Sequence, residues 1–238
     1  MSRFDKVGAR IRTALAASLL LLNVAATAPT DPANPTCPKF MNWSTYPEMK
    51  FTPETINGVR VLKAEGQIDQ DVPAKLQDAL KANDPQEIWI RSPGGDARAG
   101  NAAGKIIRDA MIPTRIPNGW ACFSACNFMF MGGAIRYVDQ GGIFAVHMFT
   151  HLGDKEAVRS ELKNTDKAIG MIGDVEQDSA LLASEDNDFL IRMGVSRKLL
   201  TDVMYKQKAV AEGKDQSTRR CLTIDEDYQY NVATKILN

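Results

Sequence analysis

Apolar and polar residues alternate along this chain with two periodicities, one typical of helices and one typical of strands. Residues 71–82 carry Val72, Leu76 and Leu80 on one side of a helix. Short apolar runs bounded by glycine or proline predict strands. The predicted helices are 71–82, 97–110, 126–131 and most of 155–193; the predicted strands and extended pieces are 59–64, 87–91, 113–117, 135–138 and 143–148, and a last strand or short helix follows Cys221. This alternation predicts an α/β fold with crossover connections.

The first thirty residues have a different pattern. Four basic residues precede an apolar run over residues 13–28, which ends in small residues and is followed by prolines. This order is typical of a secretory signal peptide, and we expect cleavage after Ala26. The apolar run is shorter than the about 20 residues that a membrane span needs. A retained membrane anchor is therefore the less favoured alternative.

Removal of residues 1–26 leaves 212 residues, a length that suits one domain with a substantial core. We predict an irregular, proline-rich lead-in over residues 27–57 and one domain over residues 58–238. The whole chain balances 29 basic against 29 acidic residues, and removal of four basic and one acidic residue leaves a net charge of −3. This charge gives no reason to expect nucleic acid or an anionic membrane as a partner. No later segment is apolar enough to span a bilayer.

The four cysteines are Cys37, Cys122, Cys126 and Cys221. An even number of cysteines in an exported protein predicts disulfides, and four cysteines allow three full pairings among which the sequence does not choose. A zinc site is disfavoured because no Cys-x-x-Cys pair exists and His147 and His151 are the only histidines. An unpaired or reactive thiol is the remaining alternative. We expect no metal and no other cofactor.

Three segments carry candidate chemistry. After the strand 87–91, the pair Gly94-Gly95 leaves backbone N–H groups bare, and such groups can hold a developing oxyanion. Ser124 lies at a predicted strand-to-helix junction, where a serine is either the N-cap of the helix or a nucleophile. Two of the cysteines bracket it, and a disulfide from either would hold this turn in place. His147 ends an apolar strand, as either a core residue or a rigidly held general base.

Together the three features are more specific than any one of them. Ser124 follows Gly94 by 30 residues, and His147 follows Ser124 by 23. Over residues 59–150 the chain resembles the proteolytic subunit of Clp protease and its relatives in the Clp/crotonase superfamily. It is similar, more closely, to small exported Clp-like proteins with a Cys-x-Ser-Ala-Cys signature. The matching residues are densest in segments 90–95, 121–125, 132–137 and 145–147. The resemblance implies an α/β fold of the Clp/crotonase type, a spiral of β-β-α units in a single domain.

The resemblance also implies an exported serine hydrolase, a peptidase in the periplasm or outside the cell. Ser124 would be the nucleophile and His147 its general base, acting on a peptide or protein substrate through an acyl-enzyme. The N–H groups of Gly95 and Ala125 would form the oxyanion hole, with Gly94 shaping the turn. Relatives assemble into trimers or stacked rings, so the resemblance implies a homo-oligomer. No ATPase partner is expected, since exported compartments lack ATP.

The chain departs from the family at the third catalytic position. Clp proteases place an aspartate in a stretch that resembles residues 219–223, where this chain has Arg219 or Arg220. The other aspartates that could reach His147 are not supported by the alignment; they are Asp202, Asp215 and Asp188. A Ser-His dyad, a displaced triad and an inactive relative all remain open. The alternative function is therefore a catalytically weak or inactive protein that binds a peptide or protein in the same cleft. An acyl-CoA enzyme of the crotonase type is disfavoured because CoA chemistry is not expected outside the cytoplasm.

Overall fold

The computed structural model describes residues 30–31, 34–148, 155–207 and 219–235. The predicted signal peptide, residues 1–26, lies outside this part of the chain, as do His151 and Asp215. Among the helices that the structure describes, none is long and apolar enough to cross a bilayer.

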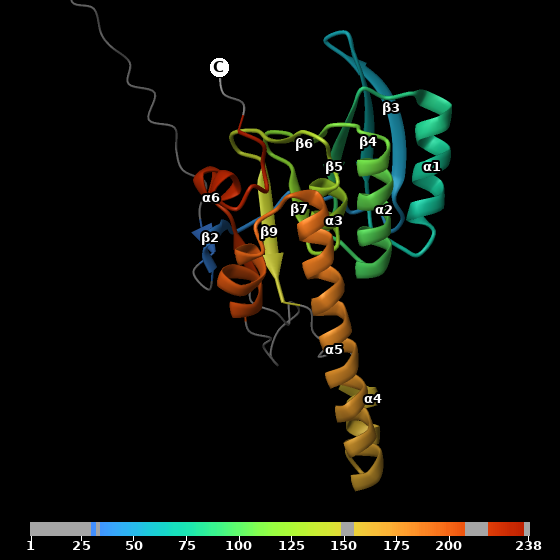
Figure 1. The fold of residues 1–238 in the computed structure, drawn as a ribbon, viewed down its shortest axis with the longest axis vertical. Helices are drawn as coiled ribbons and strands as arrows, with labels where there is room; N and C mark the ends of the chain where they lie inside the picture. The colour runs from blue at the N-terminus through green and yellow to red at the C-terminus, as the bar shows by residue number, and fades with distance from the viewer. Residues whose placement is uncertain (1–29, 32–33, 149–154, 208–218, 236–238) are drawn as a thin grey trace, which may run out of the picture.

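A five-stranded sheet forms the first layer of the molecule (Figure 1). Its strand order is β3-β4-β5-β6-β8, with β3 antiparallel to β4 and every later pair parallel. The strands are β3 (Lys50–Ile56), β4 (Val59–Glu65), β5 (Glu87–Arg91), β6 (Thr114–Ile116) and β8 (Arg136–Val138). Leu62, Ile88 and Ile90 are fully buried between this sheet and its helices. The parallel strands therefore carry the main core, as buried β-branched and leucine-rich strands do in α/β proteins.

A second, smaller sheet lies beside the first and has the order β10-β9-β7. Its strands are β7 (Ala121–Phe123), β9 (Ile143–His147) and β10 (Arg219–Cys221). Two isolated bridges, Ser92 to Cys122 and Ile68 to Gly95, continue this layer toward the earlier part of the chain. Each turn of the chain thus passes through the first sheet, then the second layer, then a helix.

The helices of the three turns are α1 (Val72–Asn83), α2 (Ala97–Asp109) and α3 (Cys126–Met131). Asp96 caps α2, because its carboxylate accepts a hydrogen bond from the N–H of Ala99 at 2.8 Å. Helices α2 and α3 lie in close contact, since a Cβ at Gly104 would stand only 2.3 Å from the carbonyl oxygen of Phe128. The predicted α/β fold of β-β-α units is confirmed, and most of its buried apolar residues form one large cluster. A smaller cluster contains Cys37, Ala145 and Cys221.

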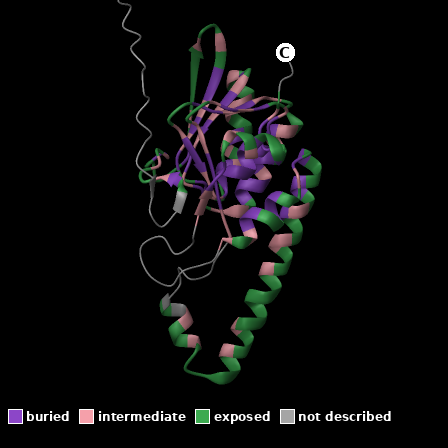
Figure 2. Cartoon of the chain, turned by 90° about the vertical axis from the view of Figure 1, so that its left-hand side faces the viewer, coloured by how far each residue is buried: buried purple, intermediate pink, exposed green. Residues whose placement is uncertain are grey.

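A helical arm extends from this body (Figures 1 and 2). It consists of α4 (Lys155–Glu161) and the long α5 (Thr165–Met193), which pack against each other. Only the last two turns of α5 are buried, through Asp186, Phe189, Leu190 and Met193. The chain then continues through a π-helical turn η1 (Leu199–Val203) and a 3-10 turn η2 (Met204–Lys206), and it ends at α6 (Ile224–Gln229).

The lead-in differs from the prediction of an irregular segment over residues 27–57. Strands β1 (Thr30–Asp31) and β2 (Asn34–Pro38) pair with each other, and β3 forms a hairpin with β4. The hairpin turns at Asn57-Gly58, whose φ angles are 50° and 81°, and Asn-Gly is the pair that favours such a turn. Pro53 is tolerated because β3 is the edge strand of its sheet.

Candidate active site

Ser124 occupies a tight turn between β7 and α3. Its φ angle of 59° lies in the left-handed region, which costs a non-glycine residue about 1–3 kcal/mol. The N-cap of α3 is Ala125, and no side-chain hydrogen bond caps this helix. Ser124 is therefore not the helix cap that the sequence left open. Its Oγ lies 2.7 Å from Nε2 of His147 instead.

His147 stands at the end of β9, next to the Ser124 turn. Strands β7 and β9 are parallel, with Phe123 opposite Ala145. The buried amide of Asn127 donates a hydrogen bond of 2.7 Å to the carbonyl of Ala145 and so ties α3 to β9. The imidazole packs on Phe123 with ring centroids 4.6 Å apart, and Phe123 stacks in turn on Trp43. The contact between serine and histidine is thus held by strand pairing, a buried hydrogen bond and an aromatic stack.

The loop from Ser92 to Gly95 runs directly beside the Ser124 turn. The N–H of Ser92 donates to the carbonyl of Ala121, and the N–H of Phe123 donates to the carbonyl of Ser92, each at 3.1 Å. Gly94 has a φ of 92°, and a Cβ there would lie 2.6 Å from the Cβ of Ser124. A side chain at position 94 would therefore push the two turns apart.

Two backbone N–H groups at this junction are open to a ligand. The N–H of Gly94 donates to the Oγ of Ser92 at 3.0 Å, so it is engaged within its own turn. In the described part of the chain, no acceptor takes a hydrogen bond from the N–H of Gly95 or of Ala125. Both residues line the cleft that holds Ser124 and His147. This arrangement can stabilise negative charge on an oxygen placed between them.

The cleft has a volume of about 190 Å³. Besides the residues above, its walls include the apolar side chains of Phe128, Leu182 and Met204 and the carboxyl group of Asp186. Pockets for small-molecule ligands usually measure about 300–1,000 Å³. This cleft therefore suits one side chain of an extended ligand better than a whole small molecule.

Comparison with family models and with curated proteins finds no match by sequence. Solved structures do match, among them a mutant of ClpP1 from Listeria monocytogenes, which is 14% identical to this chain. The match covers 73% of this chain and 88% of that chain, with a TM-score of 0.47.

An arginine, and not an aspartate, lies opposite His147 in the second sheet. Arg219 of β10 pairs with His147 of β9 across the sheet, and its guanidinium lies over the ring of Trp43, 5.4 Å from the centroid. Asp188 and Asp202 are both exposed, and neither lines the cleft. Asp215 lies outside the described residues. The structure thus brings neither of these two candidate aspartates, Asp188 and Asp202, into the site.

Asp186 is the site residue that the sequence reasoning missed. It is 4% exposed, and burial, with a smaller effect of Glu185, raises the pKa of its carboxyl group to about 7. The sequence does contain a pattern that indicates its burial. Asp186 precedes the apolar residues Phe189, Leu190 and Met193 by three, four and seven positions, and all three are buried. That spacing places the aspartate on the buried face of α5.

The four cysteines form two disulfides. Cys122 and Cys126 are joined across the Ser124 turn, four residues apart, and Cys37 of β2 is joined to Cys221 of β10, 184 residues away. The first encloses the candidate nucleophile, whereas the second fastens the lead-in to the strand opposite His147. In the described residues no three His, Cys, Asp or Glu side chains gather as a metal site would need.

Proposed function

We propose that this protein is an exported serine hydrolase, a peptidase with Ser124 as nucleophile and His147 as general base. The observation that carries the proposal is the 2.7 Å contact between Ser124 Oγ and His147 Nε2 beside two open N–H groups. A nucleophile, a base within hydrogen-bond reach and an oxyanion site are the three parts that acyl transfer requires. The left-handed turn at Ser124 supports the same assignment, because strained backbone gathers at functional sites.

The proposed reaction has two halves. Ser124 Oγ attacks the carbonyl carbon of a peptide bond while its proton moves to Nε2 of His147. The oxyanion forms between the N–H groups of Gly95 and Ala125. As the C–N bond breaks, the leaving amine takes the proton from His147. A water molecule, deprotonated by His147, then attacks the acyl-enzyme, which releases the acid and restores the Ser124 hydroxyl.

The imidazole needs a defined orientation to act as a base. Its packing on Phe123, which Trp43 supports from the other side, restrains the plane of the ring. Pairing of β9 with both β7 and β10 fixes the backbone that carries it. These contacts give His147 a rigid position in the part of the chain that the structure describes.

The alternative is a binding protein that holds a peptide or protein partner in the same cleft without turnover. It is favoured by Arg219, which stands opposite His147 in the stretch where the Clp family places an aspartate. Loss of an orienting carboxylate in a serine protease lowers the rate by about 10⁴. The two functions differ in one property, the reactivity of the Ser124 hydroxyl.

Labelling with an active-site fluorophosphonate measures that reactivity. We expect a single adduct on Ser124 in the folded, oxidised protein, found by intact mass and peptide mapping. Ser124→Ala should abolish the adduct, and His147→Ala should slow its formation by about 10²–10⁴-fold, the usual contribution of a general base. Ser196→Ala, which changes a serine outside the cleft, is the matched control and should label like the parent. If folded protein gains no adduct, the binding function replaces the hydrolase.

We also propose that the protein is exported with removal of residues 1–26, and that it forms a homo-oligomer. The two disulfides support an oxidising compartment.

The arm presents exposed apolar side chains that a second copy of the chain could cover; they are Leu162, Ile169, Ile172, Val175 and Leu181. The intact mass of the exported protein reports the cleavage, and light scattering at several concentrations reports the oligomer. A monomer at all concentrations contradicts the second proposal.

A further inference from the structure

Among the described residues, Asp186 is the one carboxyl group in the wall of the cleft that holds Ser124 and His147. It lies on the buried face of α5, and its neighbours in the wall are apolar: Leu182 one turn earlier on the same helix, Phe128 on α3 and Met204 on η2. A charged group at such a place faces the space that a ligand's side chain would occupy. The wall therefore combines apolar sides with a single acid.

In the part of the chain that the structure describes, this carboxyl group has no counter-ion. Among the described residues it forms no ion pair and no hydrogen bond, although only 4% of its surface is exposed. The titratable groups that face it are Glu185 on its own helix, Tyr205 on η2 and His147 on β9. An unpaired carboxylate buried in this way destabilises a protein, so its position calls for a functional reason.

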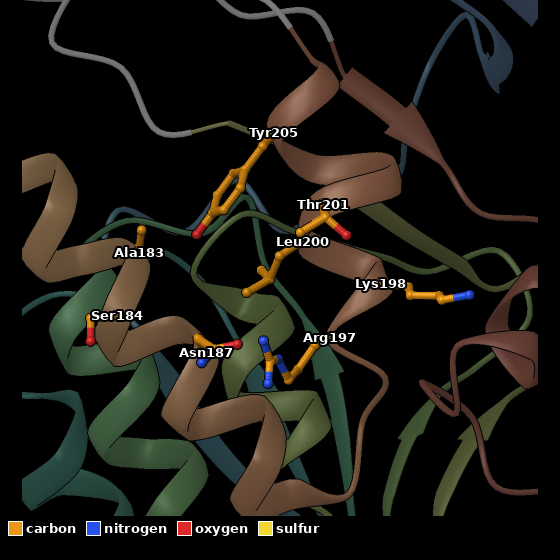
Figure 3. A pocket seen from close by; sticks show the side chains of 8 residues that line it. All are labelled: Ala183, Ser184, Asn187, Arg197, Lys198, Leu200, Thr201 and Tyr205. Carbon is orange, nitrogen blue, oxygen red and sulfur yellow. The ribbon is translucent and has the colours of Figure 1, made fainter.

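Two described cations, Arg197 and Lys198, line a different pocket (Figure 3). That pocket also includes Asn187 of α5 and Tyr205 of η2. In Figure 3 the guanidinium of Arg197 lies beside Asn187, and Lys198 points away from α5. Asp186 does not line that pocket. Because no described cation pairs with it, its carboxylate can meet a cation that a ligand brings.

We propose that Asp186 makes this cleft selective for a lysine or arginine side chain of a bound peptide. The inference rests on the proposed function, in which that side chain flanks the peptide bond presented to Ser124. The aliphatic stem of such a residue would pack on Phe128, Leu182 and Met204, and its cationic head would meet the carboxylate. A charge-assisted hydrogen bond at the end of an apolar slot rejects neutral side chains of equal length, because they leave the acid unpaired.

The test measures binding, so it does not depend on turnover. The protein is the mature Ser124→Ala variant, and the probes are two blocked tetrapeptides that differ only in lysine or norleucine at one position. Calorimetry and NMR titration at pH 8.5 should show that the lysine peptide binds about 30-fold more tightly, as expected for a partly buried charge pair. Asp186→Asn in the same background should bring the two affinities within about threefold of each other. Asp188→Asn, an exposed acid on the same helix, should preserve the preference.

The pH dependence of peptide binding gives a second test, which can be made without a substitution at position 186. The ratio of the two affinities should rise between pH 5.5 and pH 8.5, because the ionised carboxylate attracts the cation and burial holds its pKa near 7. In Asp186→Asn the ratio should be flat. A rise that survives this substitution belongs to His147 and overturns the proposal.

Equal affinities for the two peptides, or binding of neither, also overturn it. The fluorophosphonate experiment judges the hydrolase independently. A lysine preference that requires Asp186, found in a protein whose Ser124 is not labelled, would reject the peptidase and leave a cleft that binds basic peptides.

Discussion

At the scale of single residues, the backbone of Ser124 combines strain with chemistry. Its φ of 59° is unfavourable for any residue with a Cβ, whereas glycine adopts such angles freely. We expect Ser124→Gly to be more stable than Ser124→Ala by about 1 kcal/mol, although both lose the proposed nucleophile. Thermal unfolding should then show a midpoint about 2–4 °C higher for the glycine variant.

The control for this comparison is a helical position. Ala102 lies within α2, where replacement by glycine should lower stability by about 1 kcal/mol. Opposite signs at positions 124 and 102 indicate that the turn, and not glycine in general, explains the effect. A glycine variant at position 124 that melts below the alanine variant would show that the turn stores no strain.

Sequence reasoning reached some of these residues and not others, for physical reasons. Ser124 and His147 stand in motifs whose spacing is visible along the chain, and the structure brings them into contact. Asp186 stands in no motif, and its role in the cleft depends on where the end of α5 packs. Its burial could have been read from the helical spacing to Phe189 and Leu190, but its proximity to Ser124 could not.

At the scale of elements, the two disulfides differ in how much they stabilise the fold. The chain-entropy model assigns about 5 kcal/mol to a link across 184 residues and about 2 kcal/mol to a link across four. Cys37–Cys221 therefore serves global stability, and Cys122–Cys126 holds the turn that presents Ser124. Replacing the long-range pair by alanines should lower the melting temperature by about 10–20 °C, and replacing the short-range pair should lower it by about 4–8 °C.

The rate of fluorophosphonate labelling should follow the opposite order, measured well below either melting temperature. Loss of Cys122–Cys126 should slow the adduct on Ser124, because the turn is no longer closed, whereas loss of Cys37–Cys221 should leave the rate near that of the parent. Each double variant is the other's control. Equal labelling rates in the two variants would show that the short link does not position Ser124.

Most helices and strands could be predicted from the sequence, and strand β3 is the main exception. Hydrophobic periodicity located α1, α2, β4 and β5 because these elements bury one face or one stripe. Strand β3 was missed because the many prolines of residues 27–57 favoured an irregular lead-in, although Asn57-Gly58 marks a hairpin. The pairing of β10 with β9 could not be predicted, since it joins segments more than 70 residues apart.

At the scale of the whole molecule, two buried acids should make stability depend on pH. Asp186 has a pKa of about 7, and Asp227 of α6 has one of about 8; burial is the main cause for both. Asp227 is 1% exposed, and neither of its carboxylate oxygens has a hydrogen-bond partner in the described structure. In the unfolded chain an aspartate has a pKa of about 3.9. Between about pH 4 and pH 8 the folded protein therefore keeps protons that the unfolded chain has released.

Because the unfolded state binds fewer protons over this range, the free energy of unfolding falls as pH rises, by a few kcal/mol in total. The melting temperature should accordingly be higher at pH 5 than at pH 8. The double variant Asp186→Asn, Asp227→Asn should flatten this profile and melt above the parent at pH 8, while differing little from it at pH 4.5. Asp188→Asn changes an exposed acid and should keep the slope of the parent. A melting temperature that rises from pH 5 to pH 8 alike in parent and double variant would show that both acids ionise normally in the folded protein.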